Sequence, residues 1–194
     1  MILIQKLFCI LSLIVLSPIL ALLWIVIKTT SKGSALYCSK RLGRYKKFIW
    51  VWKFRTMYSS VPYNIRREVK KSLEWTEGQK LHADIRVTSV GKWLRRFSLD
   101  ELPQIWNVLN GSMNWIGPRP IVLEEDSKYG RYSKEIHTVK PGITGLWQVS
   151  GRNELSYHRR IAINLYYVRH QSWKLDLWII CKTFWAIIGG RGAY

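Results

Sequence analysis

The feature that most constrains this chain is an uncharged apolar run over residues 7–27. A straight helix over that run is about 31 Å long, close to the apolar thickness of a lipid bilayer. The run continues past any plausible small-residue cleavage site, so it does not resemble a cleaved signal peptide. We therefore expect residues 7–27 to form a helix that enters a membrane.

A helix-breaking pair, Ser17-Pro18, lies near the middle of this run. Proline leaves the carbonyl of Ile14 without its usual backbone donor, and each half of the run is only about 15 Å long as a helix. Such a half is too short to cross a bilayer but long enough to enter it and return. Spanning helices also tolerate proline, so hydropathy leaves a spanning and a re-entrant helix both open.

The charges that follow the run indicate its orientation. Seven basic residues lie between positions 28 and 47, namely Lys28, Lys32, Lys40, Arg41, Arg44, Lys46 and Lys47. Positive charge beside a membrane segment stays on the cytoplasmic side, so we expect the domain that follows to face the cytoplasm.

The composition excludes several classes of protein. Hydrophobic residues make up 48% of the 194 residues, too many for a disordered basic tail. The three cysteines are widely spaced, which excludes a disulfide scaffold and a cysteine-based zinc cluster. The formal net charge of +19 requires anionic partners, which could be nucleic acid, anionic lipid or phosphate-bearing substrates.

Local patterns predict a linker at residues 29–34 and a series of short elements beyond it. We expect strands at 48–57 and 146–149, and helices at 64–75, 90–97, 104–109, 156–169 and 173–188. The last helix has an apolar stripe formed by Trp173, Leu177, Cys181, Phe184, Trp185 and Ile188. Core packing and a position in the membrane interface both explain this stripe.

The segment around Asp100-Glu101 has two interpretations. Ser98 followed by Glu101 is a capping-box pattern, which predicts only the start of a helix. Alternatively, the Asp100 carboxylate is a nucleophile toward phosphorus, which requires nearby positive charge. Glu101 could then hold Mg²⁺, because this ion binds one or two carboxylates together with substrate phosphates.

Short motifs supply the positive charge. Arg119 lies between Pro118 and Pro120, a rigid setting for a guanidinium that binds phosphate. Lys53 and Arg55 lie two residues apart on the predicted strand and hence on one face of it. Gly151-Arg152 offers a further arginine.

Four motifs in order carry a resemblance to a known family. They are KFRTM at 53–57, DIRVT at 84–88, SLDELPQIWNVLNGSMNWIGPRP at 98–120 and PGITGLWQVSGRN at 141–153. This combination resembles the bacterial sugar transferase family, the monotopic polyprenyl-phosphate phosphoglycosyl transferases, in its short form. The resemblance covers nearly the whole chain.

The resemblance implies a mostly helical α+β fold. Residues 1–28 would form a re-entrant membrane helix broken at Ser17-Pro18. Residues 29–194 would form a cytoplasmic phosphoglycosyl transferase domain with interfacial amphipathic helices. The implied location is monotopic, in the bacterial inner membrane, beside anionic inner-leaflet lipid.

The resemblance also implies an activity and roles for individual residues. The enzyme would transfer a sugar 1-phosphate from a UDP-sugar to undecaprenyl phosphate and release UMP. Asp100 would be the nucleophile and Glu101 its Mg²⁺-associated partner. Phosphate would be handled by Lys53, Arg95 and Arg119, the last held between Pro118 and Pro120, while Gln148 and Arg152 would meet the nucleotide-sugar. The resemblance leaves open whether the protein forms a homodimer.

Two rival functions and one departure from the family complete the expectations. The charge and the tryptophan content also permit a membrane-tethered nucleic-acid-binding protein, although no recognised binding module is present. An inactive partner of another transferase is the third alternative. Relatives usually have an acidic residue where this chain has Asn164, whose charged counterpart could pair with Arg159 or Arg160 on an exposed helix face. We favour a structural role for Asn164.

Overall fold

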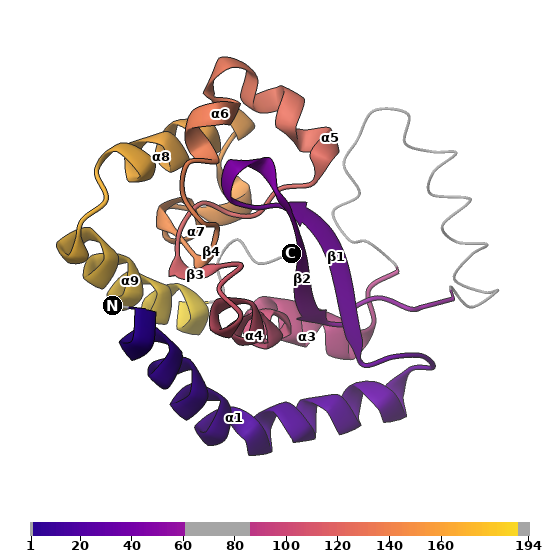
Figure 1. The fold of residues 1–194 in the computed structure, drawn as a ribbon. Helices are drawn as coiled ribbons and strands as arrows, with labels where there is room; N and C mark the ends of the chain where they lie inside the picture. The colour runs from indigo at the N-terminus through magenta and orange to yellow at the C-terminus, as the bar shows by residue number, and fades with distance from the viewer. Residues whose placement is uncertain (1, 61–85, 190–194) are drawn as a thin grey trace, which may run out of the picture.

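The computed structural model describes residues 2–60 and 86–189 of the chain (Figure 1). The predicted helix at 64–75 lies outside the described residues. The α-helices are α1 (Ile2–Thr30), α3 (Ser89–Arg96), α4 (Ile105–Leu109), α5 (Leu123–Asp126), α6 (Ser133–Ile136), α7 (Leu146–Val149), α8 (Tyr157–Arg169) and α9 (Trp173–Gly189). The strands are β1 (Leu36–Leu42), β2 (Phe48–Phe54), β3 (Asn114–Ile116) and β4 (Gly142–Thr144). Short 3₁₀ helices are η1 (Arg44–Lys46), η2 (Leu99–Gln104), η3 (Ser127–Tyr132) and η4 (Arg152–Glu154). The mostly helical α+β class is confirmed.

Helix α1 continues through Pro18 and bends near its middle (Figure 1). The hydroxyl of Ser17 donates a hydrogen bond of 2.7 Å to the carbonyl of Ile14, which proline leaves without its backbone donor. Within Lys6–Thr30, an 18-residue stretch has a mean hydropathy of 2.9, and most of that stretch is exposed in the isolated protein. Helix α1 is therefore long and apolar enough to enter a membrane.

Helix α1 packs against the rest of the molecule on both sides of its bend. Before the bend, Cys9 is completely buried in a cluster with Val51 of β2 and Ile105 of α4. After the bend, Ile27 joins a second cluster with Leu94 of α3. Helix α1 therefore shares two cores with the elements that surround the charged residues described below.

Arg55 anchors the C-terminal end of α1. Strand β2 ends at Phe54, and the buried Arg55 side chain turns toward the helix end. Its guanidinium donates to the carbonyl and hydroxyl oxygens of Ser31 at 2.8 and 2.9 Å, and also to the carbonyl of Lys32. The prediction that Arg55 shares a strand face with Lys53 is therefore wrong, because Arg55 caps carbonyls that a helix end leaves unpaired.

The four strands form two separate pairs. Strands β1 and β2 form an antiparallel hairpin in which Tyr37 lies opposite Lys53, and β1 was not expected from the sequence. Strands β3 and β4 pair in parallel. The strand predicted at 146–149 is wrong, because these residues form helix α7, whose Leu146 and Val149 pack on one cluster three residues apart.

The remaining helices agree with the predicted ranges within one residue. Helices α3, α4, α8 and α9 confirm the predictions at 90–97, 104–109, 156–169 and 173–188. The apolar stripe of α9 is exposed rather than packed in the core: Trp173 is 72% exposed and Trp185 is 67% exposed. Ile179, on the other side of α9, is completely buried, so the stripe is a second apolar surface beside that of α1.

Candidate active site

The acidic pair lies on a turn rather than at a capped helix start. Ser98 adopts left-handed backbone angles (φ 55°), and its side chain makes no capping hydrogen bond. An N-cap residue needs extended backbone angles, so the capping-box prediction is wrong. Asp100 and Glu101 lie in the 3₁₀ turn η2, which packs against β2 and leaves the Glu101 side chain free to pair elsewhere.

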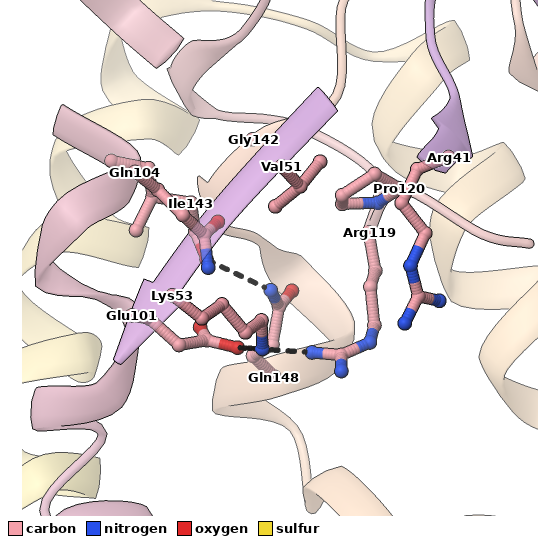
Figure 2. Close-up of a pocket in the computed structure, with 10 residues that line it drawn as sticks. All are labelled: Arg41, Val51, Lys53, Glu101, Gln104, Arg119, Pro120, Gly142, Ile143 and Gln148. Carbon is pink, nitrogen blue, oxygen red and sulfur yellow. Dashed lines mark hydrogen bonds and ion pairs between the residues drawn. The ribbon is translucent and has the colours of Figure 1, made fainter. Parts of the chain in front are cut away.

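Two cations hold the Glu101 carboxylate. Lys53 Nζ lies 2.5 Å from Glu101 Oε1, and Arg119 Nη1 lies 3.4 Å from the same oxygen (Figure 2). Lys53 Nζ also lies 3.8 Å from Asp100 Oδ2. Lys53 therefore faces both carboxylates, while Arg119 faces Glu101 across the pocket drawn in Figure 2.

The pKa values of the two carboxylates shift in opposite directions. Burial, together with repulsion from Glu101, raises the pKa of Asp100 to about 6, although Lys53, Arg95 and Arg119 oppose this rise. Burial would also raise the pKa of Glu101, but the attraction of Lys53 and Arg119 outweighs it and lowers the pKa to about 2. At neutral pH both carboxylates are thus ionised, but Asp100 has a higher proton affinity than Glu101.

Close contact between two backbones positions Arg119. A Cβ atom on Gly142 would clash with the amide nitrogen of Gly117, so only glycine fits there. The carbonyl of the buried Pro118 accepts a 3.0 Å hydrogen bond from the Gly142 amide. Pro118 therefore fixes the backbone, whereas Pro120 and Arg119 line the pocket.

The other predicted residues surround this centre at different depths. Gln148 lines the pocket from α7, and its amide donates to the Ile143 carbonyl at 3.2 Å. Arg95 Nε donates to the Thr56 hydroxyl at 3.0 Å, and its charge lowers the pKa of Asp100. Burial lowers the pKa of Arg152, and the attraction of Glu101 and Asp100 opposes this shift. Arg95 and Arg152 both act on the acidic pair electrostatically, outside the pocket lining.

The sequence analysis did not predict two polar side chains that line the pocket. Gln104 lies at the end of η2, and Arg41 extends from β1. Arg41 was counted only among the charges that set the orientation of the membrane segment. The sequence of β1, LYCSKRL, gives little signal for this strand, because apolar and polar residues do not alternate along it.

A comparison with protein-family models decides the family. The model described as bacterial sugar transferase matches residues 2–190. The chain belongs to the bacterial sugar transferase family. The acidic pair, Lys53 and Arg119 all lie within the matched range.

Named relatives of this sugar transferase agree with the family. The exopolysaccharide production protein ExoY of Sinorhizobium fredii is 40% identical over 97% of this chain and 85% of its own length. The undecaprenyl-phosphate galactose phosphotransferase of Salmonella typhimurium is 40% identical over 95% of this chain. The UDP-glucose:undecaprenyl-phosphate glucose-1-phosphate transferase of Klebsiella pneumoniae is 41% identical over 95%. This chain spans 40% and 39% of the last two proteins, which are longer.

Proposed function

We propose that this protein transfers a sugar 1-phosphate from a UDP-sugar to undecaprenyl phosphate and releases UMP, as an early membrane step in exopolysaccharide or capsule synthesis. The observation that carries the proposal is the buried Asp100 carboxylate beside Lys53, with Arg95 and Arg119 acting on it. The names of the Salmonella and Klebsiella relatives support the substrate classes.

The chemistry we assign to Asp100 occurs in two steps. An oxygen of the Asp100 carboxylate attacks the β-phosphorus of the UDP-sugar, and the bond from that phosphorus to the bridging oxygen breaks. UMP leaves with the electron pair of this bond, and a phosphosugar-aspartate remains. An oxygen of the lipid phosphate then attacks the same phosphorus, which releases the carboxylate and forms the lipid diphosphate-sugar. Lys53 and Arg119 would neutralise the charge that develops on the phosphate oxygens.

We also propose that Glu101 holds a Mg²⁺ ion beside Asp100. Repulsion from Glu101 contributes to the raised pKa of Asp100, and a divalent cation would relieve it. Glu101 would supply a hard oxygen donor through Oε2, because Lys53 and Arg119 both pair with Oε1, and substrate phosphates and water would complete the coordination shell. When bound, the ion would offset the negative charge of the diphosphate.

We further propose that residues 1–28 form a re-entrant anchor and that residues 29–194 form a cytoplasmic catalytic domain in the bacterial inner membrane. The bend at Pro18 and the exposed apolar surface of α1 support this arrangement. The exposed stripe of α9 supports a position of that helix in the membrane interface.

A UMP-release assay with a panel of UDP-sugars, with and without undecaprenyl phosphate, tests the function. We expect at least one donor to give sustained release only when the lipid is present. With that donor alone, intact mass spectrometry should detect a phosphosugar adduct on the protein. Absence of release with every donor would contradict the proposal.

The same assay separates the rival functions. Salt-dependent retention on DNA without UMP release would indicate a nucleic-acid-binding protein. A folded protein that releases no UMP and binds no DNA would fit an inactive partner of another transferase. The family match over residues 2–190 favours the transferase.

A further inference from the structure

Arg41 is a cation of the pocket that the acidic pair does not neutralise. Lys53 and Arg119 both pair with Glu101, whereas Arg41 forms no ion pair with any described carboxylate. The one hydrogen bond that its side chain makes within the described residues runs from Nε to the Ser39 hydroxyl at 3.3 Å. The guanidinium of Arg41 thus keeps most of its donors available.

The fold forces Arg41 to lie beside Arg119. The amide of Leu42 donates to the carbonyl of Ile121 at 2.8 Å, which joins the end of β1 to the segment after Pro120. Figure 2 shows Arg41 and Arg119 extending in the same direction from neighbouring backbones. Burial, together with repulsion from Arg119, lowers the pKa of Arg41, against weaker attraction from Glu125 and Glu101. Two adjacent guanidiniums of which one lacks an acid partner form a site suited to an anion.

We propose that Arg41 binds a phosphate group of a substrate, next to the group held by Arg119 and Lys53. This inference rests on the proposed function, because both proposed substrates are phosphates. The phosphate could come from the nucleotide donor, where it leaves as part of UMP, or from the lipid acceptor. A guanidinium fork is suited to either group because it donates two parallel hydrogen bonds to phosphate oxygens.

Neighbouring Lys40 provides a matched control. It precedes Arg41 on the same strand and therefore points to the opposite face, where its ammonium lies 4.0 Å from the centre of the Phe48 ring. Lys40→Gln removes one positive charge from β1 without changing the pocket. Arg41→Gln removes the same charge from inside it, and Arg41→Lys keeps the charge but loses the planar fork.

The two half-reactions are measured separately on the full-length protein in nanodiscs. The first is UMP release from the UDP-sugar without lipid, and the second is discharge of the isolated adduct by undecaprenyl phosphate. We expect Arg41→Gln to lower the second-order rate constant of at least one half-reaction by about tenfold or more, and Lys40→Gln to change each by less than about twofold. Partial recovery in Arg41→Lys is expected as well.

The pattern of loss identifies the phosphate. A loss confined to UMP release assigns Arg41 to the nucleotide donor, and a loss confined to adduct discharge assigns it to the lipid. Wild-type rates in both half-reactions for Arg41→Gln would overturn the inference, although the wild-type turnover would still support the proposed function. If thermal unfolding shows that Arg41→Gln does not fold, Arg41→Lys decides, and unchanged rates in that variant overturn the inference.

Discussion

The raised pKa of Asp100 connects its reactivity with the stability of the protein. The folded-state pKa of about 6 lies above the ordinary value of 3.8, so at neutral pH the ionised carboxylate destabilises the fold. We expect Asp100→Asn to abolish turnover and adduct formation, and yet to stabilise the protein at pH 7.5 by about 2 kcal/mol. Thermal unfolding should show this gain shrinking between pH 7.5 and 4, as the folded wild-type carboxyl is protonated. Turnover that survives the substitution would refute covalent catalysis by Asp100.

Lys53 helps to set the pH at which Asp100, the proposed nucleophile, becomes ionised. Because the attacking form of Asp100 is ionised, kcat/KM should fall about tenfold per pH unit below pH 6. Lys53 lowers the pKa of Asp100, so Lys53→Met should move this acidic limb to higher pH by about one unit, in addition to slowing the reaction. The pH profile of UMP release measures the shift. Lys47→Met, which removes an exposed lysine, should leave the limb in place.

Asn164 occupies the core, not an exposed helix face. It is only 2% exposed, and its side chain hydrogen-bonds to the buried Tyr129. The prediction of an exposed pair with Arg159 or Arg160 is therefore wrong. We expect Asn164→Asp to destabilise the fold by about 2 kcal/mol at pH 7.5 and to leave the turnover of the folded fraction unchanged.

The helix that carries Asn164 also offers its control. Ala162→Asp places the same charge at an exposed position of α8 and should cost less than about 0.5 kcal/mol. Urea unfolding of both variants compares the costs. A UMP-release rate for Asn164→Asp far above wild type would show that position 164 acts in the reaction.

At the scale of a single element, α1 depends on the pair at its bend. The hydroxyl of Ser17 satisfies the carbonyl that Pro18 leaves unpaired, so the bend persists inside an apolar environment. Pro18→Leu restores the backbone donor and raises the hydropathy, so we expect the helix to straighten and to span the bilayer more readily. Labelling of a cysteine added at the N-terminus, with Cys9, Cys38 and Cys181 replaced by serine, reports the side on which that end lies.

We expect the N-terminal label to be cytoplasmic in the protein with Pro18 and partly external in the Pro18→Leu variant. A label that is external in the protein with Pro18 would contradict the re-entrant arrangement. Because α1 shares cores with β2, α3 and α4, a straightened helix should also lower the thermal stability.

At the scale of the whole molecule, the charge of +19 should couple activity to the lipid surface. Apolar surfaces on α1 and α9 would enter or border the proposed membrane, and the chain has 31 lysine and arginine residues against 12 acidic ones. We expect membrane association and UMP release in vesicles to increase with the fraction of anionic lipid at low salt. At 0.5 M salt this dependence should weaken, because the Debye length shortens to a few ångströms. A UMP-release rate that depends neither on the fraction of anionic lipid nor on the salt concentration would contradict this role for the basic residues.

Features that depend on local pattern were predictable from the amino-acid sequence. An uninterrupted apolar run predicted α1, and apolar residues three and four positions apart predicted α3, α8 and α9. These predictions succeed because a helix makes its backbone hydrogen bonds within its own segment. The order of the motifs identified the family, and the acidic pair beside basic motifs pointed to phosphate chemistry before any contact was known.

The contacts between side chains at the site could not be predicted in this way. The sequence from Ser98 to Glu101 fits a capped helix equally well. The pairing of Glu101 with Lys53 and Arg119 depends instead on the packing of β2 against η2 and on the course of the segment after β3. Likewise Arg55 leaves the strand to cap α1, while Arg41 reaches the pocket because Leu42 pairs with Ile121. Contacts between residues far apart in the chain leave no periodic trace in the sequence, since they arise from packing of whole elements rather than from the backbone geometry of any one of them.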